Sequence, residues 1–219
     1  MMRGVKAPVQ AVSVTDRNTV AVCLVWAVAL LASGIAPYDR LTWLMEVLPV
    51  LIAAPVLVAT RGRLPLTSLG YALIAVHGLI LIYGGAYSYA RTPLGFWLQE
   101  VLGLMRNPYD RIGHLAQGFV PAMVAREVLL RVFAISGRKV LFFLVVCVCL
   151  AISAFYELIE WWAALLIGAD ADEFLATQGD VWDTQWDMFL ALVGAILAQL
   201  LLNRRHDRQL ARVTATTAP

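Results

Sequence analysis

Long apolar segments, separated by short polar stretches, dominate the pattern of this chain of 219 residues. A helix needs about 20 apolar residues to cross the hydrocarbon core of a bilayer, and the segments are close to that length. We expect about six membrane-spanning helices, over residues 20–36, 41–60, 66–83, 112–133, 140–167 and 185–203. The pattern therefore predicts an all-α, polytopic membrane helix bundle with no room for a separate soluble domain.

Two parts of the chain depart from a plain apolar run. In the longest connection, leucine, valine and methionine recur at helical spacing, which predicts an amphipathic interfacial helix over residues 94–105, before the fourth span. In the second span, Pro49 and Pro55 predict kinks, or alternatively a re-entrant segment that would leave five spans.

The composition agrees with an integral membrane protein, because 61% of the residues are hydrophobic and only 15% are charged. The formal net charge of +2 is too small to indicate a nucleic-acid partner, and we expect none. Cys23, Cys147 and Cys149 all lie in apolar runs. Their placement indicates small hydrophobic side chains rather than a disulfide framework or a metal site.

The basic residues are divided unevenly between the two expected membrane faces. With the amino terminus inside, the cytoplasmic segments hold Arg3, Lys6, Arg17, Arg61, Arg63, Arg131, Arg138, Lys139, Arg204, Arg205, Arg208 and Arg212. The other face holds Arg40, Arg91, Arg106 and Arg111. Because cytoplasmic segments are enriched in Lys and Arg, this division predicts that both termini are cytoplasmic. Residues 1–17 are then a leader, 18–203 a single transmembrane domain and 204–219 a basic tail.

The least apolar stretch lies directly before the last span. Asp180, Asp183 and Asp187 are spaced by three and four residues, so a helix that begins here carries the three carboxylates on one side. The alternative is that Asp183 only caps the last helix and that Asp180 only occupies a loop turn.

Two other spans carry polar side chains toward the same expected face of the membrane. Asp110, His114 and Gln117 share a helical face at the start of the fourth span. Glu157 and Glu160 lie three residues apart near the end of the fifth. An unpaired carboxylate in hydrocarbon is costly, so these carboxylates should face the interior of the bundle. The sequence therefore predicts a polar pocket that opens to the outside of the cell.

The chemistry of these residues suggests their roles in the expected pocket. His114, Glu157 and Glu160 are the candidate catalytic acids and bases, although an interfacial His114 that bonds a backbone carbonyl is an alternative. Asp183 and Asp187 are the candidate ligands of a divalent cation. The candidate substrate-binding residues are Asp110, Arg111, Gln117, Asp180 and Trp182.

Other intramembrane polar residues have plainer interpretations. We expect Arg126, Glu127 and Arg131 to form an interfacial group whose long side chains reach water at the cytoplasmic face. A single helix-to-helix hydrogen bond would satisfy His77, and a proton relay is the alternative. Gly194 indicates close helix packing.

Four blocks of the sequence, Tyr109–His114, Gln117–Pro121, Glu157–Trp162 and Thr177–Asp187, resemble the YjdF-like family of predicted bacterial inner-membrane proteins. The resemblance implies a multi-pass protein of the bacterial plasma membrane, and it carries no activity with it.

A weaker likeness is to VanZ-like membrane proteins. The residues that follow the order of that pattern are Asp110, Arg111, His114, Glu157, Asp187 and Gly194. The chain departs from it at Glu160 and Ala191, where the wider pattern tends to have amides. This likeness favours a site that faces the cell envelope.

Three classes of function fit these observations. The first is an outward-facing hydrolase or transferase that acts on a membrane lipid or a lipid-linked envelope molecule, with a divalent cation as its cofactor. The second is a small proton-coupled transporter or flippase, in which Glu157, Glu160 and His77 form part of a proton path. The third is a non-catalytic membrane scaffold, in which the carboxylates tolerate conversion to amides.

Overall fold

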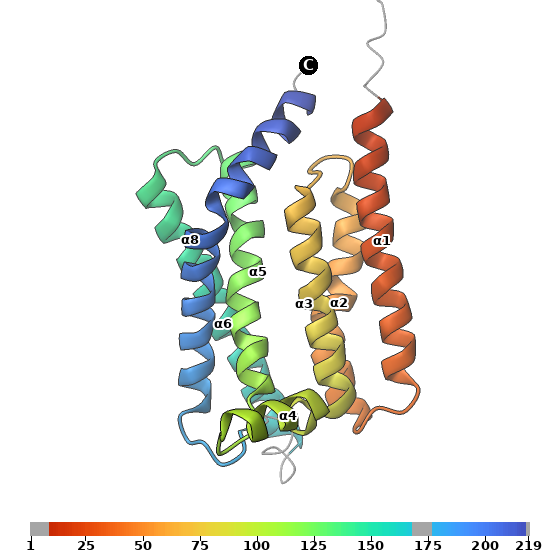
Figure 1. The fold of residues 1–219 in the computed structure, drawn as a ribbon, viewed down its shortest axis with the longest axis vertical. Helices are drawn as coiled ribbons and strands as arrows, with labels where there is room; N and C mark the ends of the chain where they lie inside the picture. The colour runs from red at the N-terminus through yellow and green to blue at the C-terminus, as the bar shows by residue number, and fades with distance from the viewer. Residues whose placement is uncertain (1–8, 168–176, 218–219) are drawn as a thin grey trace, which may run out of the picture.

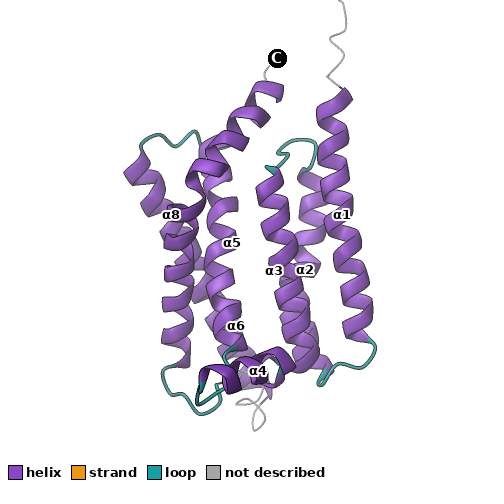
Figure 2. Ribbon diagram, in the orientation of Figure 1, coloured by secondary structure: helices purple, strands orange, loops and turns teal. Residues whose placement is uncertain are grey.

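The structure is a computed structural model, and it describes residues 9–167 and 177–217. This part of the chain forms helices joined by short connections and contains no strand (Figure 2). The helices are α1 (Val9–Gly34), α2 (Arg40–Thr60), α3 (Ser68–Tyr87), the short η1 (Tyr89–Arg91), α4 (Pro93–Leu102), α5 (Tyr109–Arg131), α6 (Arg138–Ile167) and α8 (Asp183–Thr217).

The long helices stand side by side, and the short helix α4 lies across one end of the bundle (Figure 1). Helix α5 occupies a central position, because it packs most extensively against α8 and also against α6 and α3. Helices α1, α2 and α3 pack together around Trp26, Val47 and Val50. A second apolar core lies around Met123 of α5 and Val145 of α6.

Five of the described helices, namely α1, α2, α3, α6 and α8, are long and apolar enough to cross a membrane. Helix α5 has a similar length of 23 residues, but it carries Asp110, His114, Arg126 and Glu127, which are all buried. Because its neighbours cover these side chains, α5 does not need an apolar surface. The predicted polytopic membrane helix bundle is confirmed, and α5 is a long helix whose charged side chains are buried against its neighbours.

Helices α1 and α8 extend beyond the spans expected from hydropathy. Helix α1 begins at Val9, within the expected leader, and α8 runs on to Thr217, through most of the expected tail. Hydropathy detects only the apolar part of a helix, and these extensions are polar. The α8 extension is held by Gln209, whose Oε1 accepts a hydrogen bond of 2.9 Å from the backbone N–H of Leu69. Residues 168–176 of the expected acidic loop lie outside the described residues.

Helix α2 is one continuous helix that contains both Pro49 and Pro55. Its 21 residues are enough to cross a membrane, which favours a full span over the re-entrant alternative. Asp39 caps its first turn by accepting a hydrogen bond of 2.7 Å from the backbone N–H of Thr42. This hydrogen bond lowers the pKa of Asp39.

The amphipathic helix expected over residues 94–105 is α4, which ends at Leu102. Gly103 follows it with a left-handed φ of 62°, a conformation that terminates helices. Helix α4 lies across the end of the bundle (Figure 1). Its Phe96 and Trp97 are 51% and 57% exposed, so it presents apolar side chains on its surface. This is the arrangement expected of a helix at the membrane interface.

Two glycines let α5 and α8 approach each other closely. A Cβ atom at Gly118 would overlap the carbonyl oxygen of Ala191, and a Cβ atom at Gly194 would overlap the carbonyl oxygen of Leu115. Small residues permit this backbone contact between membrane helices, and the packing role expected for Gly194 is confirmed. The contact fixes the register of α5 against α8.

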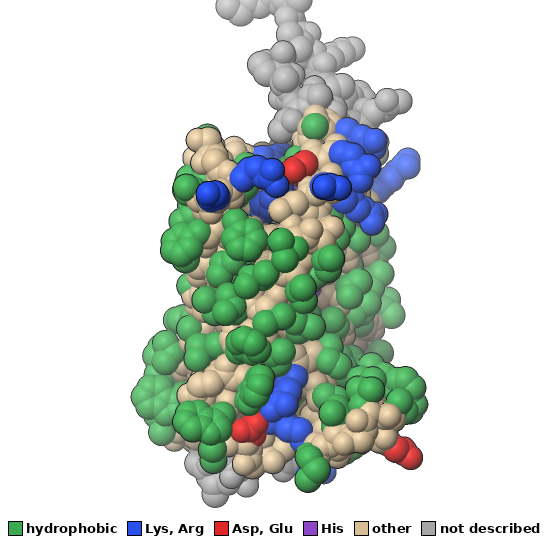
Figure 3. Space-filling view, turned by 60° about the vertical axis from the view of Figure 1, so that its left-hand side comes forward, with side chains coloured by type: hydrophobic (Ala, Val, Ile, Leu, Met, Phe, Trp, Pro, Cys, Tyr) green, Lys and Arg blue, Asp and Glu red, His purple; other side chains and the backbone are tan. Residues whose placement is uncertain are grey.

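Basic side chains gather at one end of the molecule, beyond a wide apolar band (Figure 3). Both described chain ends lie at this end (Figure 1). We call it the basic end, and its basic residues include Arg61, Arg63, Arg131, Arg138, Lys139, Arg204, Arg205, Arg208 and Arg212. The opposite end, which holds α4 and the first turns of α5 and α8, is called the α4 end. The gathering of basic side chains is in keeping with a cytoplasmic basic end.

Replacing Gly118 with alanine should destabilise the bundle, because the added methyl group overlaps the backbone of α8. We expect a loss of about 1–3 kcal/mol, the usual cost of overpacking a core. Thermal unfolding of the detergent-purified protein measures it. Gly62→Ala is the control, since a Cβ there meets nothing within 4 Å. Equal melting temperatures for the two variants would contradict the close contact.

Candidate functional site

His114 lies at the centre of a buried polar cluster at the α4 end, to which α5, α6 and α8 contribute. Its Nε2 atom lies 3.5 Å from Oδ1 of Asp110 and 3.8 Å from Oδ2 of Asp187. Its Nδ1 atom lies 3.0 Å from Oε1 of Gln117 and 3.8 Å from Oε1 of Glu157. The structure thus brings five of the residues selected from the sequence into one cluster.

Helical spacing and the glycine contact explain this arrangement. Asp110 and His114 are four residues apart on α5, so they share a face. Gly118 lies one turn beyond His114, and Ala191 lies one turn beyond Asp187. Because α5 and α8 touch at Gly118 and Ala191, His114 and Asp187 face each other one turn away from the contact.

Three carboxylate oxygens in the cluster are buried and form no hydrogen bond: Oδ2 of Asp110, Oε1 of Glu157 and Oδ1 of Asp187. The first lies 3.8 Å from Nη2 of Arg106 and the second 3.8 Å from Nδ1 of His114, so only the oxygen of Asp187 has neither a hydrogen bond nor an ion pair among the described residues. The three residues are only 7%, 8% and 3% exposed. A buried charged oxygen without a partner is strongly unfavourable, so such groups require a proton, a cation or a bound ligand. The cluster therefore has the chemistry of a ligand site rather than that of a completed internal network.

Asp110, His114 and Asp187 have the spacing of metal ligands, since one ligand atom from each lies within 4.8 Å of the others. Metal–ligand bonds of about 2.1 Å place neighbouring ligand atoms roughly 3.0–3.5 Å apart. The separations of 3.5 Å and 3.8 Å from Nε2 of His114 are close to that range. One imidazole and two carboxylates are a suitable donor set for a divalent transition-metal cation.

The expected pairing of Asp183 with Asp187 does not match this geometry. Asp183 is buried and forms an ion pair with Nη1 of Arg106, on the connection between α4 and α5. Asp187, one turn further along α8, lies against His114 instead. The structure therefore groups Asp187 with Asp110, which the sequence suggested only as a substrate-binding residue.

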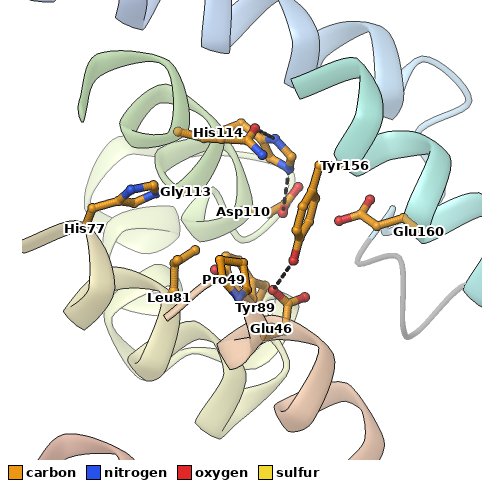
Figure 4. Close-up of a pocket in the computed structure, with 11 residues that line it drawn as sticks. Glu46, Pro49, His77, Leu81, Tyr89, Asp110, Gly113, His114, Tyr156 and Glu160 are labelled. Carbon is orange, nitrogen blue, oxygen red and sulfur yellow. Dashed lines mark hydrogen bonds and ion pairs between the residues drawn. The ribbon is translucent and has the colours of Figure 1, made fainter. Parts of the chain in front are cut away.

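A cavity of about 90 Å³ adjoins the cluster (Figure 4). Glu160 lines it from α6, and Glu46 lines it from α2. The hydroxyl of Tyr156 lies 3.5 Å from Oε2 of Glu46, a contact that links α6 to α2. His114 lines the same cavity. The cluster around His114 and the carboxylates of Glu46 and Glu160 therefore border one common space. The volume suits several water molecules or one small polar group.

The remaining residues selected for substrate binding lie at the rim of the site or outside it. Arg111 forms an ion pair of 2.8 Å with Asp180, and its guanidinium stacks over the ring of Trp186 at 5.2 Å. Trp182 is 63% exposed and does not line the cavity. Arg111 and Asp180 therefore bind each other at the rim, beside the ion pair of Arg106 with Asp183.

His77 and Glu46 also belong to the cavity. The sequence places Glu46 in the outer half of the second span and gives His77 a role only in the alternative proton path. Both line the cavity, and Nε2 of His77 has no hydrogen-bond partner, so the helix-to-helix bond expected for this side chain is not formed at that atom. The sequence signal for Glu46 is that it is a single acidic residue within an apolar span, which usually marks a functional position. Nothing in the sequence pattern indicated Arg106, whose position depends on the fold of the α4–α5 connection.

The interpretation of Arg126, Glu127 and Arg131 as side chains that reach water was wrong. Arg126 and Glu127 are 7% and 1% exposed. Glu127 accepts hydrogen bonds from Nη1 of Arg131 at 2.7 Å, from Nε2 of His206 at 3.1 Å and from the backbone N–H of Thr67 at 3.1 Å. Helix α8 covers these groups because it continues past the expected span. We call Thr67, Arg126, Glu127, Arg131, His206 and Asp207 the Glu127 network.

Comparison with known proteins places the chain in a family. A family model described as a predicted membrane protein, DUF2238, matches residues 18–208. The chain is 58% identical over 195 residues to the inner membrane protein YjdF of Escherichia coli (strain K12), an alignment that covers 89% of this chain and 92% of that protein. No solved structure matches the chain.

These matches confirm the resemblance seen in the sequence blocks and the location in the bacterial inner membrane. Five apolar helices agree with a multi-pass protein. The chain therefore belongs to the DUF2238 family of predicted membrane proteins.

Proposed function

We propose that this protein is a metal-dependent membrane enzyme that faces the outside of the cell and hydrolyses or transfers a polar group of a lipid or lipid-linked envelope molecule. One observation carries the proposal: Asp110, His114 and Asp187 offer buried ligand atoms within 4.8 Å of one another. Each of the two aspartates also has one buried carboxylate oxygen that forms no hydrogen bond, which supports the proposal.

A divalent cation accounts for the charges of the cluster better than protons do. A protonated His114 would balance one of the nearby carboxylates of Asp110, Glu157 and Asp187. Arg106, 3.8 Å from Asp110, is the other described cation at the cluster, but it is shared with Asp183, so at least one carboxylate stays uncompensated. An uncompensated carboxylate would then have to be a neutral acid, and that acid would need an acceptor for its proton.

A cation held by Asp110, His114 and Asp187 would balance the charges of the two aspartates. The oxygens nearest Nε2 of His114 are Oδ1 of Asp110 and Oδ2 of Asp187, and bidentate coordination would also engage the other oxygen of each carboxylate, which forms no hydrogen bond. Zn²⁺ or Mn²⁺ fits the mixed nitrogen and oxygen donors.

The glutamates of α6 are placed to move the protons of a hydrolysis. A cation held by Asp110, His114 and Asp187 would supply Lewis-acid activation of the scissile group and of water. Glu157, whose Oε1 lies 3.8 Å from Nδ1 of His114, would accept a proton from the attacking water as the oxygen of that water bonds to the scissile atom. Glu160, on the wall of the cavity, returns a proton to the leaving oxygen as the old bond breaks. In a group transfer, the hydroxyl of an acceptor replaces water.

The size of the cavity limits what part of a substrate can enter. Pockets for whole small molecules are usually about 300–1,000 Å³, whereas this cavity is about 90 Å³. Only the reacting group fits, and the apolar part of the substrate stays in the membrane. Arg111, whose side chain is 32% exposed at the rim, is a cation that an anionic head group would reach in competition with Asp180.

Replacing His114 with alanine, or Asp187 with asparagine, should remove the bound metal. The purified protein is loaded with Zn²⁺ or Mn²⁺, freed of excess ion and subjected to elemental analysis. We expect one cation per chain in the unmodified protein and at least about tenfold weaker binding in each variant. Glu100→Gln is the matched control, because Glu100 is exposed on α4. An unmodified protein that retains no cation under these conditions would remove the metal from the proposal.

Replacing Glu157 with glutamine should abolish turnover while the metal stays bound. The loss of a general base costs about 10²–10⁴-fold in rate. The assay follows head-group release from phospholipids and lipid-linked phosphates in proteoliposomes, again with Glu100→Gln as the control. Full activity of Glu157→Gln would reject the catalytic role of Glu157. Full function of both Asp187→Asn and Glu157→Gln in the cell would favour a non-catalytic scaffold.

A proton-coupled transporter is the second candidate, because buried polar groups lie at both ends of α5. Between them, however, lies an apolar core of fully buried side chains, namely Ala122, Met123, Val145, Cys149, Ala195 and Ala198. This core interrupts a proton path along α5, so we rank the enzyme first. The discriminating measurement is proton flux into proteoliposomes under a pH gradient, for which the enzyme proposal expects no flux above empty vesicles. Flux that Glu160→Gln abolishes would reverse the ranking.

A further inference from the structure

A second and larger cavity, of about 680 Å³, lies at the basic end. Three segments form its walls: the turn after α2, the end of α5 and the α8 extension. The residues that line it are Arg63, Leu64, Leu130, Arg131, Val132, Asp207, Leu210 and Ala211. This volume falls within the range of pockets that bind small molecules. The cavity lies at the other end of α5 from His114, and the inference drawn from it does not depend on the proposed function.

The Glu127 network holds the walls of this cavity in place. Nη1 of Arg126 can only donate a hydrogen bond, so Nδ1 of His206, 2.9 Å away, is the acceptor. Nε2 of His206 then carries the hydrogen and donates it to Glu127 at 3.1 Å. Arg126 also donates to Asp207 at 2.7 Å. The α8 extension is thereby fixed to α5, and the cavity has defined walls.

The charges of the network are balanced, which leaves a positive charge on the cavity wall. Arg131 pairs with Glu127, Arg126 pairs with Asp207, and His206 is neutral in the tautomer just derived. Arg63 is exposed, and none of the ion pairs among the described residues involves it. An anion in the cavity would therefore meet Arg63 without competition from an unpaired carboxylate.

The apolar part of the lining distinguishes a lipid from a soluble anion. Leu130, Val132 and Leu210 are the larger apolar side chains that line the cavity, beside Arg63 and Arg131. Val132 and its neighbour Phe133 are 57% and 64% exposed, so the apolar lining continues onto the outer surface of the bundle. A ligand that complements both the positive charge of Arg63 and the apolar lining has an anionic group next to an acyl chain.

We propose that the cavity at the basic end binds an anionic phospholipid of the cytoplasmic leaflet, with its phosphate at Arg63 and an acyl chain along Val132. Basic pockets between helices at the cytoplasmic face are suited to anionic lipid head groups. The distribution of Lys and Arg favours this face for the basic end.

The test measures binding of phosphatidylglycerol and phosphatidylcholine to the full-length protein in detergent, by native mass spectrometry. The protein should prefer phosphatidylglycerol. Arg63→Gln should weaken its binding about fivefold, the factor that corresponds to one cation near the membrane surface. Ala211→Trp should have a similar effect, because it fills the cavity without changing the charge. Arg205→Gln is the control, since Arg205 is exposed on α8 and does not line the cavity.

Three outcomes would overturn the proposal. The first is equal affinity for the two lipids. The second is a loss in Arg205→Gln as large as that in Arg63→Gln, which would mean attraction by the basic surface as a whole. The third is displacement of phosphatidylglycerol by millimolar inorganic phosphate, which would assign the cavity to a soluble anion. Thermal unfolding of each variant without lipid checks that the fold is intact.

Discussion

The burial of α5 is the constraint on which the rest of the structure depends. This helix carries His114 near one end and Glu127 near the other, and lipid offers neither of them a partner. Helix α8 supplies partners at both ends, through Asp187 and His206. The polar side chains of α5 thus determine which helix lies against it, and the glycine contact allows that helix to come close enough.

The two polar centres on α5 differ in a way that separates a structural role from a functional one. At the basic end, Glu127 accepts hydrogen bonds from Thr67, Arg131 and His206, so its charge is fully compensated. At the α4 end, one carboxylate oxygen of Asp110 and one of Asp187 form no hydrogen bond. Native proteins rarely leave buried polar groups unsatisfied without a reason, and a completed network on the same helix shows that partners could be provided.

Much of the fold followed from the sequence, because apolar segments of bilayer length leave few alternatives to a helix bundle. The neighbourhood of Asp110 and His114 was also predictable from their helical spacing. The ion pair of Asp183 could not be predicted, because its partner Arg106 lies on the irregular connection between α4 and α5. Glu127 was wrongly expected to reach water for a related reason. Its partner His206 lies on the polar extension of α8, which hydropathy cannot distinguish from an unstructured tail.

The continuity of α8 has a mechanical consequence. Its 35 residues form a rod of about 52 Å at 1.5 Å per residue, and it is attached to α5 at three levels. These levels are the Glu127 network, the contact of Gly118 with Ala191, and the pair of His114 with Asp187. A slide of α8 by one residue would break all three attachments at once. The two helices are therefore held together as one unit, and any opening of the cavity beside His114 has to come from its other walls, which α2, α3 and α6 supply.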